Sequence, residues 1–237
     1  MIPKRIYQIW FNKNGTIDIP EDVLKYIKQV KQWCLLHGYE YVLIDNNSKL
    51  LKECMETSTF CKKQAHRPVA LSDYIRLYAL NKYGGIYLDT DVLIKEGFDK
   101  FLEGDYFIGY ENSEASNHRF HRFDVGTFGS APNNEVLIKL MWLMNTYLWP
   151  HYLNCGLLNT IVPNIPKEDS RYYNNGVWYA IPDMFPFVVN ILLGKEILYN
   201  YKIEPLKFDD QYFKVYDIMY FSSGGKYTEH MFNTKWD

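Results

Sequence analysis

The sequence has few cysteines, almost no excess charge of either sign and no long apolar run. Its four cysteines form no Cys-x-x-Cys pair and no Cys/His cluster of zinc-finger spacing. Scattered thiols are typical of a reducing compartment, although a disulfide between two of them stays open. The net charge of −2 excludes the broad basic surface of a nucleic-acid-binding protein. We therefore expect no nucleic acid partner.

No segment reaches the roughly 18 consecutive apolar residues of a membrane-spanning helix. The nearest candidate, residues 136–163, is interrupted by Lys139, Pro150 and His151. We interpret it as a core helix first and a membrane-surface contact second. No basic and apolar leader precedes the first predicted strand, so we expect a cytoplasmic protein. Peripheral contact at the inner face of the membrane is compatible with that location.

Aromatic residues, in contrast, are abundant: they make up 17% of the chain, with 21 Tyr and 6 Trp. Aromatic faces stack on sugar rings and on bases, so the excess is compatible with carbohydrate or nucleotide binding. An aromatic-rich core in a chain biased toward Asn, Lys, Ile and Tyr is the simpler explanation of the composition alone. The chain length favours one domain spanning residues 1–237.

Apolar periodicity in the first half predicts alternating strands and helices. Helical spacing of Val23, Ile27, Val30 and Cys34 predicts a helix over 21–37, ended by Gly38. A stronger helix begins near Pro68, with Leu71, Ile75, Tyr78 and Ala79 as its buried stripe, and ends at Gly84-Gly85. The predicted strands are 6–11, 39–44, 86–88 and 92–94, and a short helix follows Ser48. This order predicts an α/β fold with a partly parallel sheet.

The second half is less regular. Strands are predicted over 106–110, 125–130, 203–206 and 215–221, and a helix over 134–148. No internal repeat and no low-complexity linker divides the chain.

Two carboxylates follow the strand at 86–88. In an extended segment Asp89 and Asp91 point the same way, with Thr90 on the other side. Ligands gather at the carboxyl ends of strands in such sheets. Two convergent carboxylates there need a compensating cation, and oxygen ligands suit Mg²⁺ or Mn²⁺. A lone Asp-x-Asp, however, is also common as a solvated turn.

The surrounding residues are more specific. The segment ALSDYIRLYAL at 70–80, followed by YGGIYLDTDV at 83–92, closely resembles the DXD signature of glycosyltransferase family 32. This family includes capsular-polysaccharide and initiating-mannosyltransferase-like enzymes, and the clostridial glucosylating toxins carry a related block. The opening IPKRIYQIW at 2–10 resembles the first strand of the family. His230 and Trp236 keep the six-residue separation of its tail.

The resemblance implies a GT-A fold, a Rossmann-like mixed sheet flanked by helices. It also implies a nucleotide-sugar donor, Mn²⁺ or Mg²⁺, and retention of configuration. In this scheme residues 1–95 bind the nucleotide-sugar and residues 96–237 bind the acceptor. The implied metal ligands are Asp89, Asp91 and His230. The implied donor contacts are Trp10 against the base, Asp73 and Arg76 on sugar and phosphate, Tyr87, Asp89, and Lys235 and Trp236 of the tail.

Several of these residues have ordinary structural alternatives. Asp73 and Arg76 could form a surface helix pair, Trp10 and Tyr87 could be core residues, and Lys235 could belong to a solvated tail. Tyr7 replaces a histidine that is common in the family, and Val125 replaces an asparagine. The segment at 125–130 is expected to face the reacting sugar. That makes Asp124 a candidate for positioning the acceptor or shielding one face of the sugar, with Glu111 and Asn112 as weaker candidates.

The resulting functional hypothesis is transfer of a hexose or N-acetylhexosamine from a nucleotide-sugar, with UDP-sugars favoured, to a saccharide or lipid-linked oligosaccharide. For a lipid-linked acceptor, the expected membrane contact is the aromatic stretch of Trp142, Tyr147, Trp149 and Tyr152. Two other classes remain open. A metal-dependent nucleotidyl or phosphoryl transferase also uses paired aspartates, and a non-catalytic carbohydrate-binding module would account for the aromatics.

Overall fold

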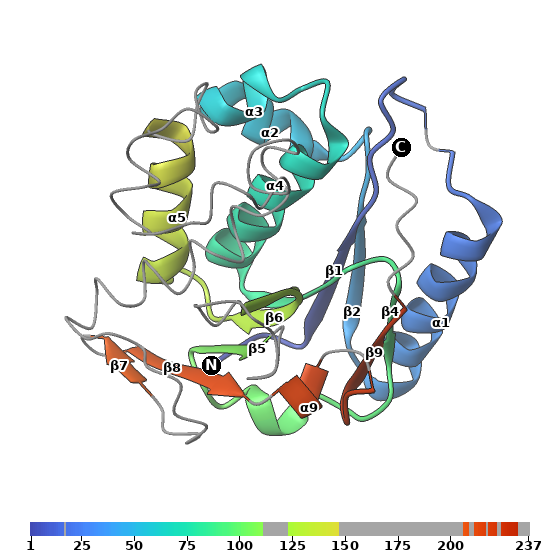
Figure 1. Ribbon diagram of the computed structural model, residues 1–237, viewed down its shortest axis with the longest axis vertical. Helices are drawn as coiled ribbons and strands as arrows, with labels where there is room; N and C mark the ends of the chain where they lie inside the picture. The colour runs from blue at the N-terminus through green and yellow to red at the C-terminus, as the bar shows by residue number, and fades with distance from the viewer. Residues whose placement is uncertain are drawn as a thin grey trace, which may run out of the picture.

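The computed structural model describes residues 1–16, 18–110, 123–146, 206–208, 211–216, 218–221 and 224–231. Within them a twisted central sheet carries helices on both faces (Figure 1). The predicted α/β architecture of GT-A type, a Rossmann-like mixed sheet flanked by helices, is confirmed.

The central sheet has seven strands in the order β2-β1-β3-β6-β5-β8-β7. β1 pairs in parallel with β2 and β3, whereas β6 is antiparallel to both β3 and β5. A separate ribbon pairs β4 with β9. The strands are β1 (Arg5–Ile9), β2 (Glu40–Ile44), β3 (Gly85–Leu88), β4 (Val92–Ile94), β5 (Tyr106–Tyr110), β6 (Phe123–Ser130), β7 (Leu206–Phe208), β8 (Gln211–Tyr216) and β9 (Thr228–His230).

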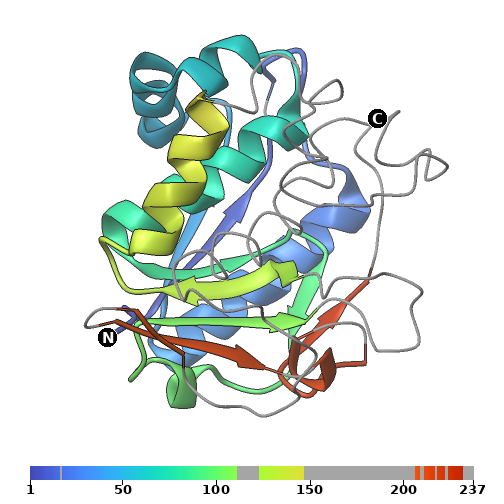
Figure 2. The same ribbon diagram turned by 60° about the vertical axis from the view of Figure 1, so that its left-hand side comes forward.

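The helices form a layer on each face of the sheet. α1 (Glu21–His37) lies on one face, and α4 (Pro68–Tyr83) and α5 (Glu135–Thr146) lie on the other, with α2 (Lys49–Thr57) and α3 (Thr59–Lys63) beside them (Figures 1 and 2). Short turns of helix, η1 (Asp99–Phe101) and α9 (Ile218–Phe221), lie near the β4–β9 ribbon. Because side chains alternate along a strand, Ile6 joins the core cluster of α1 and Tyr7 that of α4 and α5.

Several helix ends follow directly from local sequence. The Ser48 hydroxyl accepts a hydrogen bond from the Leu51 amide and begins α2. Gly38 ends α1 in the left-handed conformation, and Pro68 occupies the first turn of α4. The predictions for these three helix ends are confirmed.

Other local predictions were wrong. α4 does not bury one stripe: every residue from Ala70 to Leu77 is buried, because α2, α3, α5 and the sheet surround it. The strand predicted over 215–221 is divided, since β8 ends at Tyr216 and 218–221 form α9. A short continuous apolar run does not distinguish a strand from a buried helix. Of the strand predicted over 203–206, residues 203–205 lie outside the described residues, and Leu206 begins β7. The helix α3 was not predicted.

The described cysteines are buried and reduced. Cys34, Cys54 and Cys61 are free thiols, so no disulfide joins any of these three. Burial raises the pKa of Cys34 to about 12, which keeps this thiol protonated and unreactive at neutral pH. Cys155 lies outside the described residues. Among the helices that the structure describes, none combines the length and the apolar character needed to cross a bilayer.

The junction between α4 and β3 depends on two glycines. Gly84 and Gly85 have φ angles of 66° and 127°, values that residues with a Cβ rarely adopt. A Cβ at Gly85 would lie 2.7 Å from the backbone carbonyl oxygen of Arg5. Glycine therefore lets β3 approach β1 closely and carry the residues that follow into the site.

Replacing Gly85 with alanine is expected to destabilise the protein by about 3 kcal/mol or more, because backbone strain and a backbone clash add together. Gly38→Ala is the matched control, since Gly38 has a φ of 72° but nothing within 4 Å of its added Cβ. This control is expected to cost about 1–2 kcal/mol, from the strain alone. Urea denaturation of both variants measures the difference. Equal losses of unfolding free energy in the two variants would show that the clash with the Arg5 carbonyl adds nothing to the cost of Gly85→Ala.

Candidate functional site

The Asp89-Thr90-Asp91 segment forms a hydrogen-bonded turn between β3 and β4. The Val92 amide donates to the Asp89 carbonyl at 3.1 Å, and the Asp89 amide donates to the Gly126 carbonyl at 2.8 Å. The extended geometry predicted from the two-residue spacing was therefore wrong. The two carboxylates nevertheless converge, since one oxygen of each lies within 4.8 Å of the other.

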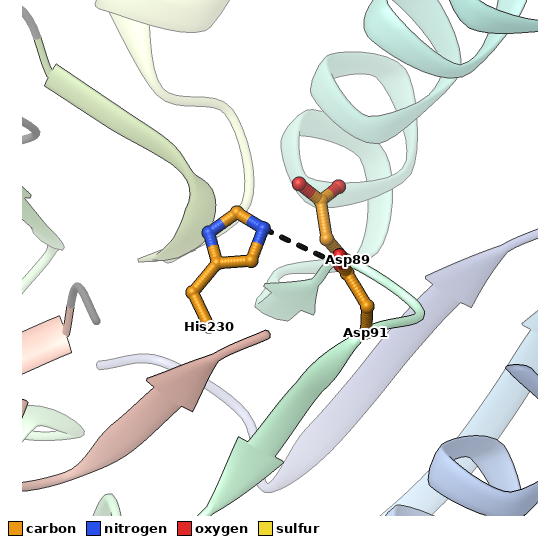
Figure 3. Close-up of side chains that lie close together, drawn as sticks. All are labelled: Asp89, Asp91 and His230. Atoms are coloured by element: carbon orange, nitrogen blue, oxygen red, sulfur yellow. Dashed lines mark ion pairs between the residues drawn. The ribbon is translucent and has the colours of Figure 1, made fainter. Parts of the chain in front are cut away.

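A histidine from the far end of the chain completes this group. β9 pairs with β4 so that His230 stands opposite Val92, and the Met231 amide donates to the Asp91 carbonyl at 3.1 Å. Figure 3 shows the His230 ring directed at the carboxylate of Asp91, with Nε2 3.3 Å from Oδ1. One ligand atom each from Asp89, Asp91 and His230 lies within 4.8 Å of the others.

This group fits a divalent cation. Two carboxylates and one imidazole are ligands that Mn²⁺ accepts and Mg²⁺ tolerates less readily because of the nitrogen. The space beside them depends on Gly126, where a Cβ would lie 2.8 Å from Asp89 Oδ2 and 3.2 Å from His230 Cε1. A side chain there would fill the position next to the ligands.

The charges around His230 are mainly negative. Burial alone lowers the pKa of His230, but the hydrogen bond to Asp91 and the neighbouring carboxylates outweigh it and raise the pKa to about 9. Surrounding charge thus favours a cation at this point in the structure, either as a proton on the ring or as a metal ion.

Asp73 and Arg76 form a buried ion pair on α4, not a surface pair. Arg76 Nη2 lies 2.9 Å from Asp73 Oδ1, and Arg76 Nη1 lies 3.4 Å from Asp89 Oδ1. Nη1 also donates to the Val125 carbonyl at 2.9 Å. The guanidinium therefore joins α4, β6 and the turn.

Burial raises the pKa of Asp73 to about 7, against the lowering by Arg76, while Asp89 adds to the rise. For Arg76, burial lowers the pKa, but Tyr87, Asp89 and Asp73 outweigh it and the net direction is upward. Arg76 thus stays charged and is the cation that compensates the carboxylates on this side of the turn.

Tyr87 is a fully buried residue that orients Asp89. Its hydroxyl donates to Asp89 Oδ1 at 2.6 Å, and the Arg76 guanidinium lies 4.4 Å from the centre of its ring. Burial raises its pKa well above the usual value, so the hydroxyl keeps the proton that it donates. Tyr87 therefore contacts the predicted ligand Asp89 from inside the core.

Trp10 lies in the core on the α1 side of the sheet. It packs with Val23 and Ile27, its Nε1 donates to the Asp18 carbonyl at 3.1 Å, and only 5% of the residue is exposed. Trp10 is therefore placed as a core residue, which is the alternative that the sequence left open. Little of its ring is exposed for stacking on a base.

Asp124, on β6, lies beside the candidate metal-binding group of Asp89, Asp91 and His230. Its Oδ1 accepts a hydrogen bond from the Gly126 amide at 2.9 Å, and the added Cβ at Gly126 would lie 3.1 Å from the same oxygen. A buried third carboxylate, that of Asp124, thus borders the same space as Asp89 and His230. Sequence reasoning missed Gly126, although a glycine inside a strand indicates a close approach of a ligand or another backbone.

Of the remaining predicted residues, Trp142 alone lies in the described part of the chain. Trp142 is on α5 and 52% exposed. The other residues lie outside the described part of the chain, namely Glu111, Asn112, Tyr147, Trp149, Tyr152, Lys235 and Trp236.

Comparisons with known proteins agree with the motif. The family model described as "Capsular polysaccharide synthesis protein" matches residues 1–155. An inositol phosphoceramide mannosyltransferase 3 of Schizosaccharomyces pombe is 37% identical over 196 residues, which cover 78% of this chain and 51% of the relative. An uncharacterized glycosyltransferase of Acanthamoeba polyphaga mimivirus is 29% identical over 150 residues, covering 60% of this chain and 57% of the relative. The chain thus spans little more than half the length of these relatives.

Solved structures show weaker likeness. A glycosyltransferase involved in glycosylation of the major capsid of PBCV-1 has a TM-score of 0.41 and 14% identity, covering 98% of this chain and 94% of that one. The PaToxG glycosyltransferase has a TM-score of 0.44 and 21% identity, covering 82% of this chain and 79% of that chain. The fold described above rests on its own sheet order and not on these likenesses.

Proposed function

The chain belongs to the capsular polysaccharide synthesis protein family, and we propose that it is a metal-dependent, retaining glycosyltransferase. It would transfer a hexose or N-acetylhexosamine from a nucleotide-sugar, with UDP-sugars favoured, to a saccharide or lipid-linked oligosaccharide. Residues 1–95 would bind the donor and residues 96–237 the acceptor. The similarity to a mannosyltransferase and to a viral glycosyltransferase supports the reaction class.

One observation carries the proposal: the convergence of Asp89, Asp91 and His230 from two distant parts of the chain. The β4–β9 pairing that brings them together forms a ribbon separate from the central sheet. A non-catalytic sugar-binding module needs no such ligand set. A nucleotidyl or phosphoryl transferase could use the carboxylates, but its triphosphate substrate calls for several basic groups. In the described part of the chain, the arginine beside this turn is Arg76, and it is already paired with Asp73 and Asp89.

In the proposed reaction, the bond between the sugar and the diphosphate breaks while the sugar becomes oxocarbenium-like. Negative charge grows on the departing diphosphate, and a divalent ion held by Asp89, Asp91 and His230 would supply Lewis-acid stabilisation of that charge. Tyr87 and Arg76 keep the Asp89 carboxylate in one orientation through contacts of 2.6 and 3.4 Å. Such preorganisation matters because no reorganisation is then needed as charge develops.

Asp124 is proposed to position the acceptor hydroxyl or shield one face of the sugar, since its buried carboxyl borders the same space as Asp89. We favour attack of the acceptor on the face that the diphosphate leaves. The alternative is a double displacement through an enzyme carboxylate. Trapping of a glycosyl adduct on Asp124 would establish that alternative. If the acceptor is lipid-linked, the exposed Trp142 on α5 is the described candidate for membrane contact.

The test is thermal stabilisation by a panel of UDP-sugars and GDP-mannose, each with Mn²⁺ and with a chelator. One donor at a hundredfold excess over its dissociation constant is expected to stabilise the protein by about 2.7 kcal/mol, only with metal. The donor identified is then assayed for hydrolysis and for transfer.

Two results would contradict the proposal. Stabilisation by a nucleoside triphosphate and metal, with none by a sugar nucleotide, would indicate a nucleotidyl or phosphoryl transferase. Binding of glycans without metal, and of no donor, would indicate a carbohydrate-binding module.

A further inference from the structure

A single polar side chain interrupts the buried face of β1. Ile6, Gln8 and Trp10 alternate onto the same side of the sheet, and Gln8 is completely buried, with an exposure of 0%. A buried amide is retained only where both of its ends find partners, since an unsatisfied polar group in the core is costly. Its partners therefore indicate its role.

Both ends of the Gln8 amide are hydrogen-bonded. Its Nε2 donates to the backbone carbonyl of Asp89 at 3.0 Å, and its Oε1 accepts from the Tyr41 hydroxyl of β2 at 3.0 Å. Burial raises the pKa of Tyr41, so this hydroxyl keeps its proton and remains a donor. Because Tyr41 occupies the oxygen end, the amino end of Gln8 must face the turn.

The Asp89 carbonyl is thereby held by two donors, the Gln8 amide group and the Val92 backbone amide at 3.1 Å. A carbonyl has two lone pairs, so both are used and the Asp89–Thr90 peptide has no room to rotate without losing a bond. That peptide begins the turn that leads from Asp89 to Asp91, so holding it constrains the backbone from which both carboxylates project.

We infer that Gln8, itself oriented by Tyr41, is a positioning residue that fixes the turn carrying Asp89 and Asp91. This inference rests on the proposed function in naming a metal ion as what the turn binds. The bond from Gln8 to the turn is made to the Asp89 backbone carbonyl, so Gln8 acts through the backbone, as the outer partners of a metal site do. The chain of contacts runs from β2 through β1 to the turn.

The variants are Gln8→Met, which keeps the side-chain length and removes both hydrogen bonds, and Tyr41→Phe, which removes one hydroxyl. Asn134→Ala is the matched control, because Asn134 is a buried amide that caps α5 through the Val136 amide at 3.0 Å. The control tests whether any loss of a buried amide has the same effect. The probe is Mn²⁺ alone, titrated by calorimetry.

Gln8→Met is expected to weaken Mn²⁺ binding by about 10- to 100-fold, as loss of an outer partner does. Tyr41→Phe is expected to weaken it by about three- to tenfold, since the amide loses only the group that orients it. The double variant is expected to bind no more weakly than Gln8→Met, because Tyr41 acts through Gln8. Asn134→Ala is expected to bind as the native protein does.

A Mn²⁺ affinity of Gln8→Met within about twofold of native would overturn the inference. The inference would also be overturned if the double variant lost Mn²⁺ affinity by the product of the two single-variant losses. If the native protein binds no Mn²⁺, the metal dependence in the proposed function is wrong. Hydrogen exchange then tests separately whether Gln8 holds the turn. Exchange of the Val92 amide is expected to be about tenfold faster in Gln8→Met and unchanged in Asn134→Ala. Unchanged exchange in Gln8→Met would mean that Gln8 does not hold the turn.

Discussion

Asp91→Asn is expected to lower the rate of sugar transfer about a thousandfold or more, which corresponds to about 4 kcal/mol of transition-state stabilisation. Asparagine keeps the shape of the side chain but removes the negative charge that lies 3.3 Å from His230 Nε2. The metal-binding group would then have one carboxylate in place of two. The measurement is the initial rate of transfer with saturating Mn²⁺, together with the metal-dependent thermal shift produced by the donor.

Glu229→Gln is the matched control for this variant. Glu229 is the neighbour of His230 on β9, and its carboxylate pairs with Lys95 at 3.2 Å, away from Asp91. The charge change is the same, but the metal-binding group is intact, so transfer is expected to stay within about twofold of native, as for surface substitutions in general. A metal-dependent shift that persists in Asp91→Asn would show that Asp91 is not a ligand.

Arg76→Met is expected to destabilise the protein by about 3–5 kcal/mol, the cost of leaving buried charges without their partner. Asp73 and Asp89 both pair with this guanidinium, at 2.9 and 3.4 Å, and the side chains of Arg76 and Asp73 are each only 7% exposed. Adding Asp73→Asn is expected to recover part of the loss because it removes one uncompensated charge. Urea denaturation gives the three free energies of unfolding.

Arg5→Met is the control, because Arg5 also pairs with a carboxylate, Glu40 at 2.6 Å, but near the surface. An exposed pair contributes about 0–1 kcal/mol, so this loss is expected to be several times smaller. Equal losses of unfolding free energy in Arg5→Met and Arg76→Met would mean that the ion pairs of Arg76 do not hold α4 and the turn together. Sugar transfer is expected to fall with Arg76→Met and to be retained with Arg5→Met.

Much of the fold followed from local sequence. The helix over 21–37 was predicted with the bounds that are observed, since its apolar spacing and Gly38 agree. The strand at 106–110 was likewise predicted as observed. The run at 215–221 was not, because an apolar run without periodicity carries no information on which element it forms.

The candidate site was predictable in composition but not in geometry. The DXD motif and its flanking blocks indicated Asp73, Arg76, Asp89 and Asp91 together. The sequence could not indicate that Arg76 is buried, because the polar spacing of α4 is also that of an exposed helix. Nor did it indicate Gln8, since a glutamine in a strand has no pattern that distinguishes a solvated side chain from a buried one.

By itself, then, the sequence determined the family, the order of the first strands and helices, and the residue types of the site, because these depend on motifs and on contacts between near neighbours. The tertiary structure alone decided that Asp89 to Asp91 form a turn and that His230 reaches Asp91 through the β4–β9 pairing. It also decided that Gln8 and Tyr41 hold that turn. These contacts join residues far apart along the chain, and only the packing of strands against one another fixes which of them meet.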